Sequence, residues 1–251
     1  MARIFFIDSD NISGNLIAFS SDDNKHLLSL RKETGQSVTC VQEIDDGHVV
    51  KYGVLLNKHG KDFSGLIEEK EEVAIPDKTK IHILQCIPKL DKMELIIQKL
   101  SELGVYEIVP LFSRYTDIHD HIGDNKSSRW QKISRESAIQ SGRLNLLKVH
   151  VPLQLKSYLQ EMNSDSDKTI DIVLSELEIG RHLHDVEEKI KNPNTKDIFI
   201  LIGAEGGFDP QEITFVQSIG FLSITLGETI MRTETPALVA VSIIQYLLGN
   251  L

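Results

Sequence analysis

Residues 80–112 read KIHILQCIPKLDKMELIIQKLSELGVYEIVPLF, and this stretch contains the pattern that decides the fold class. Lys80–Ile87 is an apolar run of strand length, and Asp91–Leu103 follows with apolar side chains at helical spacing on one face. Gly104 then occupies the position of a helix C-cap glycine, and Val105–Phe112 is again strand-like. A strand, a helix and a strand in this order predict a β-α-β unit, and such units favour a parallel sheet with right-handed crossovers.

The same alternation continues to the end of the chain. Asp209 supplies a helix N-cap, Pro210 a first-turn proline and Glu212 a capping-box acid. The further strand-like runs are Ile170–Leu174, Asp197–Ile202 and Phe221–Leu226, and the helix-like segments are Arg181–Lys191, the stretch after Asp209 and the stretch after Thr235-Pro236. We therefore predict an α/β domain over residues 73–251.

The N-terminal part has a different character. Arg3–Ile7, Gln36–Gln42 and His48–Leu56 are short runs rich in β-branched and aromatic residues, and Asp45-Asp46-Gly47 is a hairpin-type turn between the last two. Strands this short favour a small barrel. Because the charge run of residues 68–72 is typical of a solvated edge or linker, we place the domain boundary there, which gives a first domain of residues 1–72.

Composition is that of an ordinary globular protein. The chain has 251 residues, of which 41% are hydrophobic and 25% are charged. It contains no run of about 18 apolar residues, the length of a membrane-spanning helix, and Asp8 and Asp10 come too early for a signal-peptide core. Cys40 and Cys86 lie far apart and offer neither a disulfide framework nor a metal knuckle. These features predict a cytoplasmic protein with two reduced thiols and no membrane contact.

The net charge of −10 is unevenly distributed along the chain. Residues 1–72 carry −5, residues 73–150 carry +3 and residues 151–251 carry −8. The middle third is therefore locally basic, which is compatible with one confined anion-binding face on an acidic protein.

The segment Ile200–Phe208 places a glycine-rich turn directly after an apolar strand. Glycine allows the backbone to approach a ligand closely, and ligands of open α/β sheets bind beyond the carboxyl ends of strands. Glu205 at the centre of the turn would repel phosphate, but it suits a ligand with cationic character or hydroxyl donors. The alternative is an ordinary tight turn between a strand and a helix.

A second loop, Leu226–Thr235, also follows a strand and precedes a helix. Leu226, Ile230 and Met231 could line an apolar slot for an adenine-like ring that bonds to the main chain. Arg232 would then lie near the start of the helix, and the alternative is that it forms an ion pair with Glu234.

Basic residues of the middle third could bind phosphate. Asp91 can cap the first helix of the α/β domain. Lys89 and Lys92 lie at the N-terminus of this helix, where they could bind a phosphate or could be ordinary solvated lysines. A second basic stretch, Arg129–Arg143, includes Trp130, which we expect to pack inward rather than to stack on a base. His119 and His121 lack the distant partners of a metal site, so we read their segment as a polar loop and predict no metal.

Five segments in this order resemble one family, the 16S ribosomal RNA uridine N3-methyltransferases, or RsmE family, of the SPOUT class. They are residues 26–35, 89–104, 114–143, 202–208 and 226–235. The fourth, Ile-Gly-Ala-Glu-Gly-Gly-Phe, resembles the family pattern IGPEGG(F/L) with Ala204 in place of proline, and the fifth resembles LG..ILR.ETA with Met231 in place of leucine and Pro236 in place of alanine.

The resemblance implies an architecture and a set of partners. Residues 1–72 would form a PUA-like β-barrel that binds RNA, and residues 73–251 a SPOUT α/β domain with a deep trefoil knot. The protein would be a homodimer acting on 16S ribosomal RNA in the assembled small ribosomal subunit. The RNA-binding residues implied are Arg31, Lys89, Lys92, Arg114, Arg129 and Arg143.

The resemblance also implies S-adenosyl-L-methionine as the methyl donor, held in the knot. The cofactor-binding residues implied are Leu174, Gly203, Glu205, Gly206, Gly207, Leu226, Gly227, Ile230, Met231, Arg232 and Thr233. Arg232 is our candidate for stabilising the anion that develops when uracil N3 loses its proton, and Glu205 or Glu234 could take that proton.

Two other classes of function are considered. One is a non-catalytic or differently targeted RNA-binding protein that keeps the knot, and the intact glycine loops argue against loss of turnover. The other is a nucleotide-binding oxidoreductase, but the sequence lacks the GxGxxG fingerprint that this class requires. Nucleophile-elbow, P-loop and HExxH signatures are also missing from the sequence.

Overall fold

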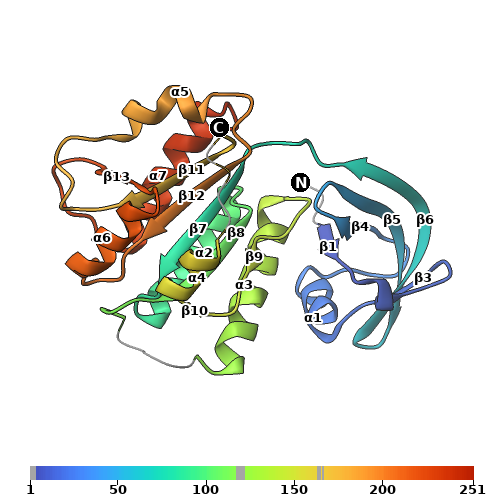
Figure 1. The fold of residues 1–251 in the computed structure, drawn as a ribbon. Coiled ribbons are helices and arrows are strands. Elements are labelled where there is room, and N and C mark those ends of the chain that lie inside the picture. Colours follow the sequence, from blue (N-terminus) through green and yellow to red (C-terminus); the bar gives the residue numbers. More distant parts are fainter. Residues whose placement is uncertain (1–3, 117–121, 163–164, 166) are drawn as a thin grey trace. The chain divides into compact units, whose positions relative to one another are not determined.

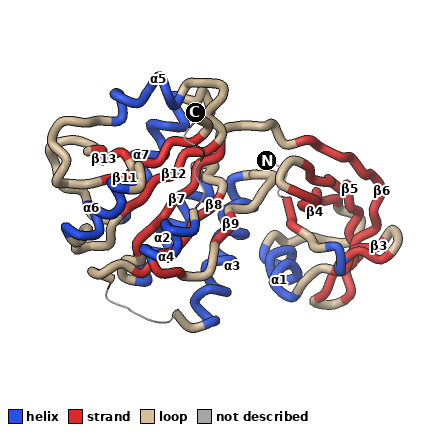
Figure 2. The backbone as a smooth tube through the Cα atoms, viewed as in Figure 1, coloured by secondary structure: helices blue, strands red, loops and turns tan. Residues whose placement is uncertain are grey.

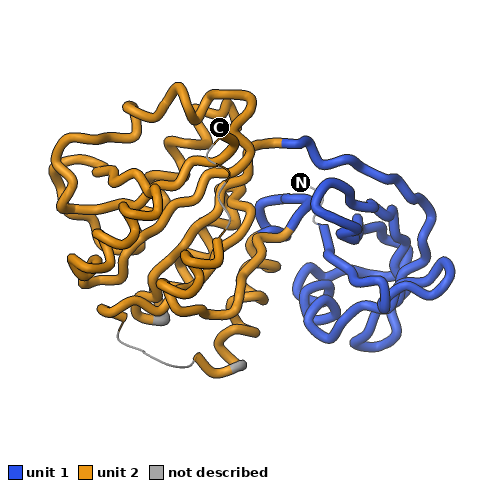
Figure 3. Tube along the Cα trace, viewed as in Figure 1, with its two compact units in different colours: residues 1–77, 138–145 blue, residues 78–137, 146–251 orange. Residues whose placement is uncertain are grey.

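The computed structural model describes residues 4–116, 122–162, 165 and 167–251. The chain divides into two compact units, each described here by itself (Figure 3). The first comprises the described residues of Met1–Asp77 together with Ala138–Asn145, and the second comprises those of Lys78–Ser137 and Leu146–Leu251.

The first unit is built on a six-stranded sheet (Figure 1). In the order of their pairing its strands are β1 (Ile4–Phe6), β4 (Ser37–Asp45), β5 (His48–His59), β6 (Asp62–Ala74), β3 (Leu16–Ala18) and β2 (Ile12–Ser13). The short helices η1 (Ser9–Asn11) and α1 (Ser21–Ser29) complete the unit. Only β1 and β4 pair in parallel, and the β4–β5 hairpin turns at Asp46-Gly47 as the sequence predicts.

The charge run of residues 68–72 is not a linker, because it lies inside β6. This segment pairs with β5 along its length and its side chains are exposed, so it forms a solvated strand. The core of the unit gathers apolar residues of all its long strands and of α1, including Phe5, Leu27 and Val54. Gly65 is required there, since a Cβ atom would lie 2.3 Å from the Val54 side chain.

The second unit contains a sheet in which every strand pair is parallel, as the β-α-β pattern predicts. The strand order is β10 (Leu153–Gln154), β8 (Glu107–Phe112), β7 (Lys80–Cys86), β12 (Asp197–Ile202), β11 (Thr169–Leu174) and β13 (Leu222–Ile224), with β9 (Lys148–Val149) beside β8. Because both faces of a parallel sheet are covered by helices, its central strands are mostly apolar, and β12 reads DIFILI.

Helices lie on both sides of this sheet (Figure 2). Alternate residues of its strands enter two separate cores. Ile83, Ile108 and Ile200 pack against the helices of one face, whereas Leu84, Val109 and Leu201 pack against those of the other. The first face is covered by α2 (Leu90–Glu102), α3 (Asp124–Ser141), η2 (Leu183–Val186), α5 (Glu187–Ile190) and α7 (Glu234–Leu247), and the second by α4 (Leu155–Glu161) and α6 (Pro210–Ser218).

Local signals were read correctly at most helix ends. Asp209 caps α6 through a capping box with Glu212, Gly104 follows α2 with φ +81°, and Trp130 is fully buried. Three expectations were wrong. Helix α2 begins at Leu90 with Lys89 as N-cap, so Asp91 is not the cap. Helix α7 begins one residue before Thr235, and the helix expected over 181–191 is only η2 and α5.

Two further expectations concern thiols and membranes. Cys40 and Cys86 are both unpaired and buried, and burial raises the pKa of each thiol to about 12. In the part of the chain that is described, no helix is long and apolar enough to cross a membrane.

Candidate functional site

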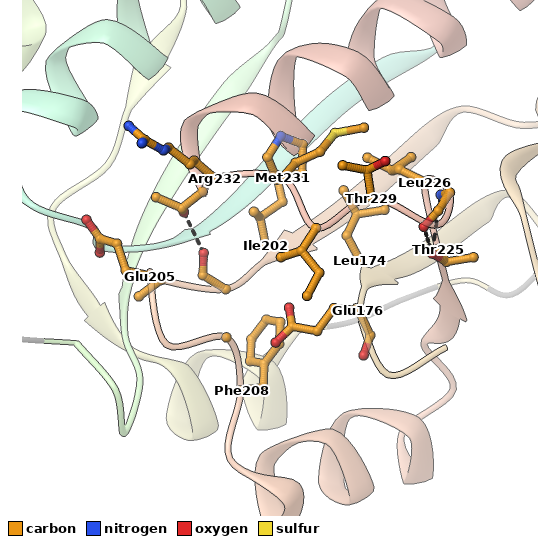
Figure 4. Close-up of a pocket in the computed structure, with 18 of the residues that line it drawn as sticks. Leu174, Glu176, Ile202, Glu205, Phe208, Thr225, Leu226, Thr229, Met231 and Arg232 are labelled. Carbon is orange, nitrogen blue, oxygen red and sulfur yellow. Dashed lines mark hydrogen bonds between the residues drawn. The ribbon is translucent and has the colours of Figure 1, made fainter. Parts of the chain in front are cut away.

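Three parallel strands end side by side at one edge of the second unit's sheet. Leu174 is the last residue of β11, and it is in register with Ile202 at the end of β12 and Ile224 at the end of β13. Beyond these ends lies a cavity of about 410 Å³ (Figure 4). Its walls come from the segments that follow the three strands, namely residues 175–176, 203–208 and 225–233, with Lys92 and Pro236. This is the position at which open α/β sheets bind ligands.

The first wall is the tight turn of residues 203–207. The Gly207 amide donates to the Ala204 carbonyl oxygen at 3.0 Å, and these two residues form an isolated β-bridge. A Cβ atom on Gly203 would lie 3.0 Å from the Cα of Gly207, and Gly207 has φ +68°. Both glycines are therefore required for the turn to close.

The second wall is the loop of residues 225–233. The Thr225 hydroxyl donates to the Gly227 carbonyl oxygen at 3.1 Å, and Gly227 has φ +130°. Ile230 is 78% exposed at the cavity, although it is a large aliphatic residue. Together with Leu174, Ile202 and Leu226 it supplies an apolar surface beside the backbone of the loop, which suits an adenine ring.

The two walls are joined by hydrogen bonds beneath the cavity. The Thr233 hydroxyl donates to the Gly203 carbonyl oxygen at 2.7 Å. The side-chain amide of Gln85, which is fully buried on β7, lies 3.4 Å from both the Gly203 oxygen and the Thr233 hydroxyl. No role for Gln85 was predicted from the sequence. A glutamine within the apolar run of residues 80–87 could have indicated one, because a buried polar side chain needs hydrogen-bond partners.

Glu205 is fixed by the Lys92 ammonium of α2 and by the backbone amide that precedes this helix. Its Oε1 atom lies 3.1 Å from the Lys92 ammonium and accepts a hydrogen bond of 3.2 Å from the Lys89 amide. Burial raises the pKa of Glu205, but the Lys89 amide and Lys92 lower it more, so the carboxyl pKa falls below its ordinary value. The hydrogen bond to Glu205 in turn raises the pKa of Lys92.

Lys92 also lies 3.5 Å from Glu234, so it pairs with two carboxylates. These ion pairs disfavour the phosphate role expected for Lys92. The ion pair between Arg232 and Glu234, which was the alternative reading of this loop, is not formed, because Glu234 pairs with Lys92. Arg232 is exposed at the rim, on the side of the cavity where Glu205 lies (Figure 4). Within the described residues its guanidinium has no ion-pair partner, which leaves it available to a substrate.

Most of the predicted cofactor residues line one cavity. They are Leu174, Gly203, Glu205, Gly207, Leu226, Gly227, Ile230, Met231, Arg232 and Thr233. Gly206 does not line it, because it packs against Tyr115, whose Cβ lies 3.1 Å from the position of a Gly206 Cβ. Glu176 and Phe208 also line the cavity and were missed, although Glu176 follows the end of a predicted strand by two residues.

The other predicted RNA-binding residues are dispersed. Arg31 and Arg143 belong to the first unit, where Arg31 has φ +53° and burial lowers the pKa of Arg143 to about 10. In the second unit, Arg114 lies 3.3 Å from Asp209, and Arg129 binds Glu94 through two hydrogen bonds of 2.5 and 2.8 Å. These ion pairs reduce the charge that Arg114 and Arg129 offer to a phosphate.

A metal site is not found among the described residues, which contain no group of three His, Cys, Asp or Glu side chains suited to an ion. His119 and His121 lie outside the described residues.

Known proteins resemble the chain over almost its whole length. The RNA methyltransferase domain family matches residues 76–245. Ribosomal RNA small subunit methyltransferase E of Buchnera aphidicola subsp. Acyrthosiphon pisum is 29% identical over 248 residues, covering 96% of this chain and 92% of that protein. The protein of the same name from Buchnera aphidicola subsp. Schizaphis graminum is 31% identical over 188 residues, covering 74% of this chain and 73% of the other.

Two solved structures share the fold. The ribosomal RNA small subunit methyltransferase E from Neisseria gonorrhoeae bound to S-adenosyl methionine is 25% identical, with a TM-score of 0.82 and coverage of 98% of both chains. A methyltransferase from Legionella pneumophila, in complex with the bound cofactor SAM, is 26% identical, with the same TM-score and the same coverage.

Proposed function

Because this chain belongs to the ribosomal RNA small subunit methyltransferase E family, it is an S-adenosylmethionine-dependent ribosomal RNA methyltransferase, and we propose that it methylates N3 of a uridine in 16S ribosomal RNA. The observation that carries this proposal is the cavity itself. Two glycine loops close an apolar slot at the ends of β11, β12 and β13, and an arginine with no ion-pair partner among the described residues stands on the rim.

The residues of the cavity fit the cofactor. Leu174, Ile202 and Leu226 would pack on its adenine ring, and the backbone of residues 203–207 and 226–231 would bond to its polar edges. Carboxylates rather than a phosphate cradle line the slot, which suits a cationic ligand. When bound, S-adenosylmethionine supplies an electrophilic methyl group on a positively charged sulfur.

Arg232 would act on the other reactant. A uracil base at the rim develops negative charge as N3 loses its proton and attacks the methyl carbon. A guanidinium aimed at that charge stabilises the transition state more than the ground state. The exposed position of Arg232, beside the apolar slot rather than beneath it, is suited to contact with the base.

Glu205 is the second residue that we expected to be catalytic. A carboxylate whose pKa is lowered by Lys92 and by the Lys89 amide accepts protons weakly. We therefore propose that Glu205 serves as a positioning residue, which fixes the 203–207 turn against α2. The carboxylate of Glu234 lies 3.5 Å from the same lysine, so it too is paired with that cation.

The family also suggests how the protein is organised. We propose that residues 1–72 act as a PUA-like RNA-binding barrel, that residues 73–251 are the SPOUT domain, and that its C-terminal segment is knotted around the cofactor loops. The antiparallel pairing of β2–β3–β6–β5–β4 supports a barrel, and the cavity formed by three separated segments supports a knot. We also propose that the protein acts in the cytoplasm, because its proposed substrate is ribosomal RNA.

We further propose that the protein is a homodimer. Tyr246 and Ile243 on α7 are 70% and 39% exposed, and Leu95 on α2, a helix that packs against α7, is 42% exposed. An apolar surface of this kind is typical of a protein–protein interface. Tyr246→Glu should convert a dimer into a monomer in analytical ultracentrifugation, and a wild-type protein that sediments as a monomer would contradict the proposal.

The decisive experiment incubates the purified protein with radiolabelled S-adenosylmethionine and small ribosomal subunits from a strain that lacks this gene. The labelled RNA is digested and its nucleosides are identified. We expect label in 3-methyluridine. Label in another nucleoside would contradict the proposed target, and absence of label despite cofactor binding would favour a non-catalytic or differently targeted RNA-binding protein.

An Arg232→Ala variant tests the role of the guanidinium. We expect the cofactor affinity to stay within about twofold and the rate of methyl transfer to fall by about 10²–10³, the range for loss of one aimed donor. Arg232→Lys, which keeps the charge, should recover part of the rate. Full activity of Arg232→Ala with normal cofactor binding would reject this role.

A further inference from the structure

Glu176 is a carboxylate inside the cavity that the mechanism above does not use. It lies two residues beyond the end of β11, where the Ser175 amide donates to the Ile224 carbonyl oxygen at 3.0 Å and the Leu177 amide donates to the Ser175 hydroxyl at 3.2 Å. The first bond holds Ser175 against the end of β13, and the second closes a local turn around Glu176.

The carboxylate of Glu176 is seated on the first glycine turn. A Cβ atom on Gly207 would lie 2.7 Å from Oε1 of Glu176, so the glycine leaves the space that the carboxylate occupies. Figure 4 shows the carboxylate directed toward the middle of the lining side chains, beside the ring of Phe208. Its other neighbours along the wall include Leu174 and Ile202, which are apolar.

The charge of Glu176 is not neutralised by the protein. Glu205 is bound by Lys92 and the Lys89 amide, and Glu178 accepts a hydrogen bond of 3.1 Å from the Gly180 amide. Within the described part of the chain, Glu176 has neither an ion-pair partner nor a hydrogen-bond donor to its carboxylate. Glu176 is exposed to solvent at the cavity wall, and a carboxylate without a protein cation in this position is suited to receive one from a ligand.

We propose that Glu176 binds the positively charged part of S-adenosylmethionine. This inference rests on the proposed function, because it assigns a residue of the same cavity to the same cofactor. The donor carries positive charge on its sulfonium and on its α-ammonium group. Either group, once enclosed in the cavity, is attracted more strongly than it would be in water, because the apolar walls reduce screening.

Calorimetric titration of the full-length protein with three ligands tests the assignment. S-adenosylmethionine carries both positive groups, S-adenosylhomocysteine carries only the ammonium, and 5′-methylthioadenosine carries neither. For Glu176→Gln we expect the affinity for S-adenosylmethionine to fall about tenfold, which is about 1.4 kcal/mol, while the affinity for 5′-methylthioadenosine stays within twofold. If Glu176→Gln loses as much affinity for S-adenosylhomocysteine as for S-adenosylmethionine, the group that Glu176 binds is the ammonium. If its affinity for S-adenosylhomocysteine is unchanged, the group is the sulfonium.

Two other variants make the result specific. Glu178→Gln is the matched control, because it removes a charge from the same segment and keeps an oxygen for the Gly180 amide, so we expect affinities close to those of the wild type. Glu176→Lys should weaken S-adenosylmethionine binding more than Glu176→Gln does. It provides an independent test of charge if the glutamine variant is poorly folded.

The inference is overturned if Glu176→Gln leaves the affinity for S-adenosylmethionine unchanged, or if 5′-methylthioadenosine loses as much affinity. It is also overturned if Glu228→Gln, which removes the other unpaired glutamate of the described cavity wall, causes the charge-selective loss instead. A wild-type protein that binds none of the three ligands would instead overturn the proposed cofactor site, so the two failures are distinguishable.

Discussion

The Thr233 hydroxyl donates a 2.7 Å hydrogen bond to the carbonyl oxygen of Gly203, although the two residues lie 30 positions apart in the chain. Gly203 opens the turn after β12 and Thr233 precedes α7. This bond therefore ties together the two loops that wall the cavity, and the buried Gln85 amide approaches the same pair of atoms from β7. The shape of the cavity therefore depends on a bond between two of the residues that line it.

Thr233→Val should open this junction. Valine keeps the shape of threonine but leaves the Gly203 carbonyl oxygen without its best donor, which costs about 1–2 kcal/mol at a buried site. We expect the free energy of unfolding to fall by about that amount and the affinity for S-adenosylmethionine to fall about five- to tenfold. Denaturant unfolding and calorimetry measure the two effects, and Thr233→Ser, which keeps the hydroxyl, should behave like the wild type. Unchanged affinity in the valine variant would show that the loops are held by other contacts.

Lys92→Met should leave Glu205 and Glu234 without the cation that they share. The pairs are partly exposed, with 24% of the Lys92 side chain accessible, so we expect a loss of stability of only about 0.5–1 kcal/mol. A double-mutant cycle with Glu205→Gln should give a coupling energy of similar size. Additive effects in that cycle would show that the ion pair contributes nothing measurable.

Gly203→Ala should disrupt the cavity through the backbone. The added methyl group would lie 3.0 Å from the Cα of Gly207, and two main-chain segments can separate only if the turn opens. We expect S-adenosylmethionine binding to fall by at least tenfold, with a lower melting temperature. Gly180→Ala is the matched control, because it lies in an exposed loop of the same unit where the nearest atom to a Cβ is 3.9 Å away. Wild-type affinity of Gly203→Ala would contradict the geometric argument.

A buried charge cluster at the amino ends of β7, β8 and β12 should set the acid stability of the second unit. His82 bonds to Glu107 at 2.7 Å and to Asp197 at 2.8 Å, and His150 bonds to the other Glu107 oxygen at 2.8 Å. Burial raises the pKa of Glu107, but the hydrogen bonds from the two histidines outweigh it and bring the pKa to about 2.

A carboxyl pKa that is lower in the folded state than in the unfolded state stabilises the protein above the unfolded value and loses that effect as the pH falls. We expect Glu107 to contribute about 3 kcal/mol above pH 4.5 that disappears between pH 4.5 and 2. Glu107→Gln should flatten the stability profile in this window, as measured by urea unfolding at successive pH values. Glu68→Gln on the exposed part of β6 should leave the profile unchanged, and a profile that Glu107→Gln does not alter would contradict the assignment.

The sequence determined the local elements of the second unit because their causes are local. Apolar runs of strand length predicted β7, β11 and β12, and Asp209 with Glu212 predicted the start of α6. The glycines of residues 203–207 predicted a turn that approaches a ligand. Local signals failed where packing competes with them, since the charged residues 68–72 extend β6 by pairing with β5 instead of forming a linker.

The partners of the charged side chains were decided only by the tertiary structure. Lys92, Arg114 and Arg129 read as cations for RNA, yet each faces a carboxylate that the fold brings near. Gln85 and Glu176 were missed for the same reason, because their roles depend on loops that are remote in the chain. A residue type determines which bonds a side chain can make. Which bonds it does make depends on the groups within a few ångströms, and these are set by the order of the parallel strands.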